Sequence, residues 1–177
     1  MFERDIISQL AAWKTDTNRK PLVVHGARQV GKTWTLKYFG REYFDDVAYF
    51  SLDKDESGLC DVFRTTKDPQ RIIQHLSFLH GKKIEPQTTL LILDEIQECN
   101  EALNALKYFC EEAPEYAVAC AGSLLGIYLN HVGKSFPVGK VNHLYMYPLT
   151  FTEFLRTKDP VMHELSLIHI SEPTRRS

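Results

Sequence analysis

The sequence has 177 residues, of which 44% are hydrophobic and 25% are charged, and its formal net charge is -2. That length and apolar content are enough for one domain with a hydrophobic core. Lysine and arginine are scattered, which excludes a basic stripe of the kind that binds nucleic acid. The opening residues are too charged for a signal peptide, no apolar run reaches the roughly 18 residues of a membrane span, and no CxxC pair is present. We therefore expect a soluble, cytoplasmic protein without a disulfide framework or a zinc site.

Hydrophobic periodicity predicts the elements of the first half of the chain. Apolar residues at helical spacing predict an amphipathic helix over 1–14. The short β-branched run at 21–25 predicts a buried strand. A second helix is expected over 32–40, closed by Gly40, and a second strand over 45–53.

The second half continues the alternation. An Asp-Pro start and a terminal glycine predict a helix over 68–81. Further strands are expected over 88–96, 115–123 and 140–149, and further helices over 100–114, 123–133 and 150–158, the last with Thr150 or Thr152 as its cap. Strands that alternate with helices predict an α/β fold, with a mainly parallel sheet covered by helices on both faces.

The segment GARQVGKT satisfies the phosphate-binding pattern G-x-x-x-x-G-K-[ST], with a strand before it and a helix after it. Its glycines let successive N–H groups point at a phosphate, and the start of the helix adds partial positive charge. In this reading Lys32 contacts the β- and γ-phosphates and Thr33 ligates Mg²⁺. A glycine turn that only caps a helix is the structural alternative. The candidate nucleotide-binding residues are Gly26, Ala27, Arg28, Gln29, Val30, Gly31, Lys32 and Thr33.

Two acids, Asp94 and Glu95, end the apolar strand of LLILDEIQ. In a nucleotide hydrolase with this loop, an acid at the end of a strand holds the Mg²⁺ shell. A glutamate directly after it can activate the attacking water as a general base. The sequence thus predicts that Asp94 and Thr33 hold the metal ion. It predicts that Glu95 and Lys32 are catalytic residues. A solvated acidic pair is the alternative.

Three further segments admit two readings each. Ser123, at the end of the fourth predicted strand, can orient the attacking water, although Gly-Ser after a strand is also an ordinary turn. His25 can line a nucleotide pocket or be a satisfied core histidine. The segment DESG imitates a guanine-nucleotide motif, but no [NT]KxD follows it, and we interpret it as a loop. That missing motif favours ATP over GTP.

The segments GARQVGKT, LLILDEIQ, AGSLLG and YPLTFTEFL occur in the order seen in a family of bacterial and archaeal AAA-type ATPases, which this chain resembles over residues 1 to about 160. The resemblance extends to Gln29 and Gln97. It implies an AAA-type P-loop sheet with strand order 5-1-4-3-2, ATP and Mg²⁺ as cofactors, and Ser123 as the sensor. It also implies a C-terminal domain after the ATPase core and leaves a homo-oligomer of the full-length protein open.

This chain departs from its relatives before the fifth strand. Many relatives carry Gly-Arg there, where an arginine could act as a catalytic finger, and this chain has Gly139 and Lys140. A lysine supplies positive charge but lacks the planar fork of a guanidinium.

The last segment breaks the pattern of everything before it. Residues 165–175, LSLIHISEPTR, match the translation of a transposase adapter used to prepare sequencing libraries. We therefore expect a nucleotide-binding domain over 1–164, a non-native tail over 165–177, and a native C-terminal part that this chain lacks. An amphipathic end to a native helix is the alternative.

The sequence favours an Mg²⁺-dependent ATPase that couples hydrolysis to a conformational change in that C-terminal domain. Two alternatives stay open. One is a nucleotide-controlled switch on a protein or DNA partner with negligible turnover. The other is a P-loop small-molecule kinase, for which the sequence offers neither a lid nor an arginine-rich acceptor site.

Overall fold

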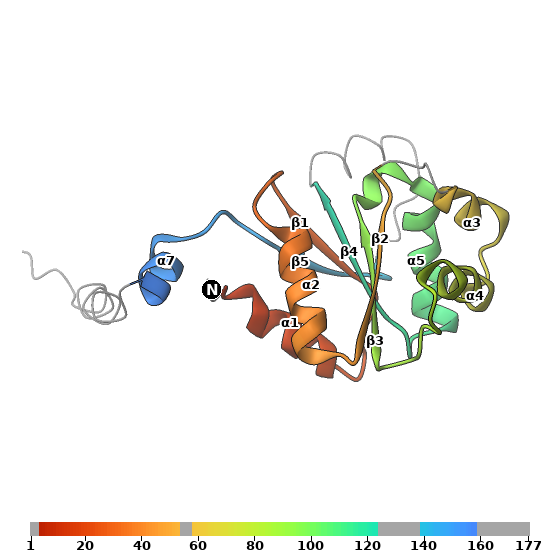
Figure 1. Ribbon diagram of the computed structural model, residues 1–177, viewed down its shortest axis with the longest axis horizontal. Coiled ribbons are helices and arrows are strands. Elements are labelled where there is room, and N and C mark those ends of the chain that lie inside the picture. The colour runs from red at the N-terminus through yellow and green to blue at the C-terminus, as the bar shows by residue number, and fades with distance from the viewer. Residues whose placement is uncertain (1–3, 54–57, 124–138, 159–177) are drawn as a thin grey trace, which may run out of the picture.

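Five parallel strands form the sheet of the computed structural model, which describes residues 4–53, 58–123 and 139–158 (Figure 1). The strands lie in the order β2-β3-β4-β1-β5, which confirms the order expected from the resemblance. Their bounds are β1 Leu22–Gly26, β2 Asp46–Ser51, β3 Thr89–Asp94, β4 Ala117–Ser123 and β5 Asn142–Tyr145. Since β1 lies between β4 and β5, the glycine loop that follows β1 emerges from the interior of the sheet.

Helices cover both faces of the sheet, as predicted (Figure 1). On one face, Leu22 and Val24 pack with the helices α1 Ile6–Thr15 and α2 Lys32–Tyr43. On the other, Val23 and Leu91 pack with α3 Leu59–Thr65, α4 Pro69–His80 and α5 Asn100–Glu112. Successive residues of β1 thus point to opposite faces of the sheet, and both faces are buried.

The helix after the glycine loop extends further than predicted, and Gly40 does not end it. α2 continues to Tyr43, and Phe44 follows it. A Cβ on Gly40 would lie 2.6 Å from Cγ2 of Val47 and 3.1 Å from Cδ2 of Leu90. This glycine therefore lets the helix approach the sheet closely, which is a packing role and not the capping role that the sequence suggested.

Local capping signals were read correctly at two other helices. Asp68 caps α4, with its side chain accepting the N–H of Gln70 at 2.9 Å, and Gly81 ends that helix at a φ of 76°. Thr150, and not Thr152, caps the last helix, α7 Phe151–Lys158. Its Oγ1 accepts the N–H of Glu153 at 3.2 Å, and Glu153 accepts the N–H of Thr150 at 2.8 Å, which is a capping box.

The remaining differences concern short elements. The structure contains α3, which the sequence analysis did not predict, and β5 is shorter than 140–149. β3 ends at Asp94, two residues before the end of the strand predicted over 88–96, and a 3₁₀ turn, η2 Ile96–Glu98, begins at Ile96. The helix predicted over 123–133 lies almost entirely outside the described residues. Within the described ranges, no helix is both long and apolar enough to cross a bilayer.

Candidate nucleotide-binding site

Parallel pairing brings the predicted site residues to one edge of the sheet. Gly26, the last residue of β1, pairs with Ser123, the last residue of β4. Asp94 ends β3, the neighbouring strand, and pairs with Ser51 of β2. Parallel strands end at a common edge, so residues from four separate parts of the chain meet there.

The glycine loop leads directly into α2. Gly31 occupies the position before the helix with a φ of 94°, in the left-handed region that favours glycine. Gln29 adopts a φ of 64°, which is costly for a residue with a side chain. Ala27, Arg28 and Gln29 are exposed at the tip of the loop. The loop thus holds a strained backbone at the start of a helix, where N–H groups lack partners within the helix.

Lys32 folds back over the loop. Its side chain is buried, and Nζ donates to the carbonyl oxygens of Gly26 at 3.0 Å and Ala27 at 2.8 Å. Burial lowers the pKa of Lys32, while the nearby carboxylates of Glu95 and Asp94 act in the opposite direction. An ammonium has three donors, so these two bonds leave one N–H of Lys32 for another acceptor.

Thr33 and Asp94 are in direct contact. The Thr33 hydroxyl donates to Oδ2 of Asp94 at 2.8 Å, and the hydroxyl of Tyr49 donates to the same oxygen at 3.0 Å. Burial, followed by the charge of Asp94, raises the pKa of Tyr49 to about 12, so the phenol stays protonated as a donor. A hydroxyl beside a carboxylate is an oxygen donor set of the kind that Mg²⁺ prefers, and the residues present fit that ion.

Glu95 lies beside a buried glutamine. Glu95 has a φ of 52°, and its Oε2 accepts a hydrogen bond from Nε2 of Gln97. Oε1 of Gln97 accepts the N–H of Ser123 at 3.3 Å. One amide therefore connects the predicted base on the β3 side with the predicted sensor at the end of β4.

His25 takes part in a stack within the protein. It is 3% exposed, its Nε2 lies 2.7 Å from Nδ1 of His143, and its ring stacks on those of His143 and Tyr145. Burial, His143 and Lys32 together lower the pKa of His25 to about 4. These contacts favour a core histidine over a residue that lines a nucleotide pocket.

Lys140 lies away from the glycine loop. It precedes β5, whose first residue, Asn142, pairs with Leu22 at the start of β1, so it occupies the opposite edge of the sheet. Its Nζ forms an ion pair with Glu111 at 2.9 Å. Lys140 therefore does not reach the site within its own chain.

Two residues near the site were missed by sequence reasoning. Tyr49 contacts Asp94 from β2, and Arg4, ahead of α1, contacts the carbonyl of Val30 in the glycine loop. Tyr49 was hidden in an ordinary strand pattern. Ser51 of β2 pairs with Asp94 of β3, and Tyr49 lies two residues before Ser51 on the same face of the strand. A predicted pairing of β2 with β3 would therefore have placed Tyr49 close to Asp94.

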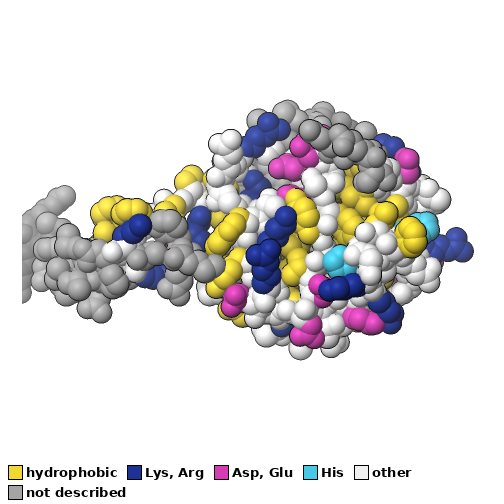
Figure 2. Space-filling view, in the orientation of Figure 1, with side chains coloured by type: hydrophobic (Ala, Val, Ile, Leu, Met, Phe, Trp, Pro, Cys, Tyr) yellow, Lys and Arg dark blue, Asp and Glu magenta, His cyan; other side chains and the backbone are white. Residues whose placement is uncertain are grey.

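On the face drawn in Figure 2, basic and acidic side chains are interspersed, with hydrophobic ones between them. Among the exposed apolar side chains of the described residues, Trp34 of α2 is 51% exposed and stacks on Tyr38. This distribution agrees with the scattered charge of the sequence.

Comparisons with solved structures concern the fold. The chain is similar to Drosophila ORC bound to AT-rich DNA and Cdc6, at a TM-score of 0.51 and 13% identity, covering 97% of this chain and 63% of that one. It is also similar to AMPPCP-bound DnaA from Aquifex aeolicus (TM-score 0.46, 14% identity, 97% and 52% coverage). Similarity to C. elegans PCH-2 has a TM-score of 0.45 and 13% identity, and it covers 98% of this chain and 49% of that one. This chain thus spans less than two thirds of each.

Comparison with curated proteins gives no match. A model of the AAA domain family, however, matches residues 18–155, which include the glycine loop, the acid pair and all five strands. The strand order and the meeting of these motifs at one edge of the sheet agree with that match. The chain therefore belongs to the AAA domain family, an AAA-type ATP-binding family.

Proposed function

We propose that this domain binds ATP with Mg²⁺ at the edge formed by β1, β3 and β4, and hydrolyses it to ADP and phosphate. The observation that carries the proposal is the contact of Thr33 with Asp94 at 2.8 Å, with Lys32 near enough for the charge of Asp94 to act on its pKa. A cation donor, a hydroxyl and a carboxylate are the groups that charged phosphates and their metal ion require. A guanine-reading motif is missing from the sequence, which supports adenine as the base.

Each residue has a distinct task in this proposal. The N–H groups at the start of α2 and the remaining N–H of Lys32 bind phosphate oxygens. Thr33 and Asp94 would hold Mg²⁺, which supplies charge neutralisation on the phosphates when it is bound. Glu95 removes the proton of the attacking water, and Ser123 orients that water. Hydrolysis then changes the conformation of the segments attached to this domain.

A switch with little turnover is the second candidate. The hydrogen bond from Gln97 to Glu95 favours it, because the amide occupies a carboxylate oxygen that a general base needs for the attacking water. In this alternative, nucleotide binding alone controls contact with a protein or DNA partner.

Calorimetric titration of the chain with Mg-ATP and Mg-GTP tests nucleotide binding. We expect binding of ATP and a rise of at least about 100-fold in Kd for Lys32→Ala, since a charged donor to phosphate is lost. Lys107→Ala removes an exposed lysine on α5 and serves as the matched control. Unchanged ATP affinity in Lys32→Ala would refute the assignment of the loop.

Release of phosphate from bound ATP separates the two candidates. Steady turnover supports the ATPase. Tight binding of ATP with no release of phosphate supports the switch.

A further inference from the structure

The segment that follows β5 runs beside the glycine loop. The N–H of Met146 donates to the carbonyl of His25 at 2.7 Å. A Cβ on Gly26 would collide with the carbonyl oxygen of Met146, so the first glycine of the loop permits this approach. The loop is thus packed against the connection that leads to α7.

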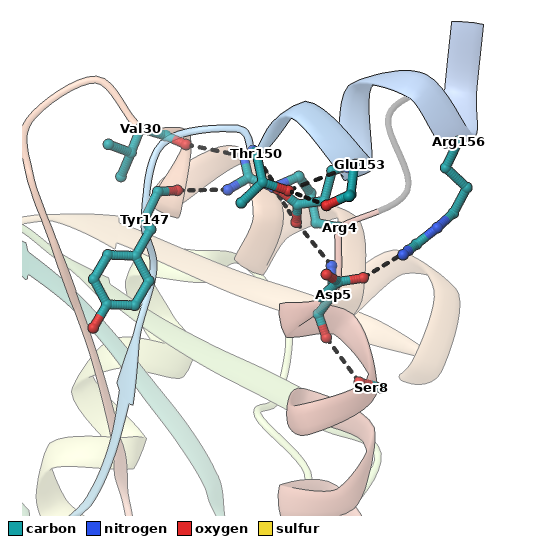
Figure 3. A network of polar contacts seen from close by, with 9 residues as sticks. Arg4, Asp5, Ser8, Val30, Tyr147, Thr150, Glu153 and Arg156 are labelled. Atoms are coloured by element: carbon teal, nitrogen blue, oxygen red, sulfur yellow. Dashed lines mark hydrogen bonds and ion pairs between the residues drawn. The ribbon is translucent and has the colours of Figure 1, made fainter. Parts of the chain in front are cut away.

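Arg4, which precedes α1, links that connection to the glycine loop (Figure 3). Its Nη2 donates to the carbonyl of Tyr147 at 2.6 Å, and its Nη1 donates to the carbonyl of Val30 at 3.4 Å. Its Nε forms an ion pair with Glu153 of α7 at 3.1 Å, across 149 positions of sequence. One guanidinium therefore contacts the glycine loop, the connection and the last described helix.

Glu153 is the other half of this contact. Its side chain is 6% exposed and that of Arg4 is 12% exposed, so water screens the pair weakly. Oε1 also accepts the N–H of Asp5 at 3.0 Å, while Oε2 accepts the N–H of Thr150 at 2.8 Å. Burial alone would raise the pKa of Glu153, but these N–H donors and Arg4 lower it. The carboxylate is therefore charged at neutral pH, and it fixes the start of α7 to the start of α1.

A second ion pair joins α7 to the segment before α1. Arg156 of α7 donates to Asp5 at 2.6 Å, and the two side chains are 32% and 57% exposed. Both pairs attach α7 to the segment before α1 (Figure 3). They differ in that the guanidinium of Arg4 also donates to the carbonyl of Val30 in the glycine loop, whereas the pair of Arg156 is with Asp5, so Arg156 serves as the matched control.

We propose that Arg4 is a positioning residue of the nucleotide site, and that through Glu153 it makes nucleotide affinity depend on the docking of α7. This inference rests on the proposed binding of ATP by the glycine loop. By binding the Val30 carbonyl, Arg4 fixes the backbone of the loop whose N–H groups bind the phosphates. Coupling between two sites is reciprocal, so bound ATP also stabilises the docked position of α7.

The test compares Arg4→Met with Arg156→Met, since methionine keeps an apolar stem and removes the guanidinium. Calorimetry gives the Kd for Mg-ATP, and hydrogen exchange gives the protection of residues 151–158 with and without ATP. For Arg4→Met we expect about a tenfold rise in Kd and loss of the ATP-dependent protection. For Arg156→Met we expect a Kd within about twofold of the wild type, and ATP-dependent protection that is retained.

Arg4→Lys and Glu153→Gln keep the test informative if Arg4→Met does not fold. Lysine keeps the charge and can contact one carbonyl, so it should restore part of the ATP affinity. Glu153→Gln should weaken the docking of α7 and raise the Kd for ATP in the same direction as Arg4→Met. A role confined to stability would lower Tm in these variants and leave the Kd unchanged.

The outcomes separate the two proposals. If the wild-type chain does not bind ATP, both are wrong. If it binds ATP and loses that binding in Lys32→Ala, while Arg4→Met and Arg156→Met bind equally well, only the role of Arg4 is overturned.

Discussion

The hydroxyl of Thr33 donates to the carboxylate of Asp94 at 2.8 Å, although 61 positions of sequence separate the two residues. One belongs to the start of α2 and the other to the end of β3. The parallel sheet makes this contact, because it delivers the ends of β1 and β3 to the same edge. The two residues therefore present a hydroxyl and a carboxylate side by side at this edge.

Tyr49→Phe is expected to weaken the dependence of nucleotide binding on Mg²⁺. The variant removes the phenol that donates to Oδ2 of Asp94 and keeps the ring. Loss of a hydrogen bond that orients a metal-binding carboxylate typically reduces metal affinity by about tenfold. The measurement is the Kd for ATP with Mg²⁺ and with EDTA. An equal change in both conditions, or none in either, would contradict a role in orienting Asp94.

Glu95→Gln should bind ATP and stop its turnover. The amide keeps the size of the side chain but cannot accept the proton of water, and general-base catalysis contributes about 10²–10⁴-fold. We expect ATP affinity within about threefold of wild type and phosphate release reduced at least about 100-fold. Glu98→Gln, an exposed neighbour, is the control. Undiminished hydrolysis in Glu95→Gln would remove Glu95 as the base.

Because of His25, the free energy of unfolding is expected to decrease as the pH is lowered below neutrality. Its pKa is about 4 in the folded chain, against an ordinary value of 6.5, so between these values the unfolded chain binds more protons. Stability is therefore complete above about pH 6.5 and decreases as the pH falls toward 4. At about 1.4 kcal/mol per pKa unit, the loss is on the order of 3 kcal/mol at most.

Urea unfolding of wild type and His25→Leu at pH 7.5 and pH 4.5 measures that contribution. The variant should lose less stability on acidification than the wild type. His143, whose pKa burial also lowers, retains part of the effect in the variant. Identical pH dependence in the two proteins would show that His25 does not titrate in this range.

Gly40→Ala should destabilise the fold despite the better helix propensity of alanine. The new Cβ would lie 2.6 Å from Val47, whose branched side chain is stiff, and such overpacking typically costs 1–3 kcal/mol against a gain of about 1 kcal/mol from propensity. We expect a net loss of about 1 kcal/mol in unfolding free energy. A double-mutant cycle with Val47→Ala should recover most of it, and a stabilising Gly40→Ala would contradict the close approach.

The features that the sequence predicted well are those written in consecutive residues. The buried strand before Gly26, the capped helix after Asp68 and the acids after β3 each depend on neighbours in the chain, and alternating strands and helices constrain the sheet to few topologies. Local patterns also indicated Lys32, Thr33 and Asp94, which the structure brings together. Their roles toward ATP and Mg²⁺ stay predictions.

The features that were missed depend on distant parts of the chain. Gly40 has the local pattern of a helix end, and only the approach of Val47 from β2 shows why the helix continues. Tyr49 contacts a residue 45 positions away, and Arg4 one that is 149 positions away. Neither contact leaves a periodic signal, because side chains of this kind are selected by three-dimensional proximity and not by spacing.

The position of β1 also constrains how the chain acquires its structure during synthesis. β1 is synthesised early, but its two partner strands are β4 and β5. Leu22 pairs with Ala119 and Asn142, so its strand cannot be paired on both sides until both of those residues have been synthesised. β2 and β3 pair over a much shorter stretch of chain and can associate first. Until β5 leaves the ribosome, a growing chain therefore carries β1 with at least one edge open, and an open strand edge can pair with another chain.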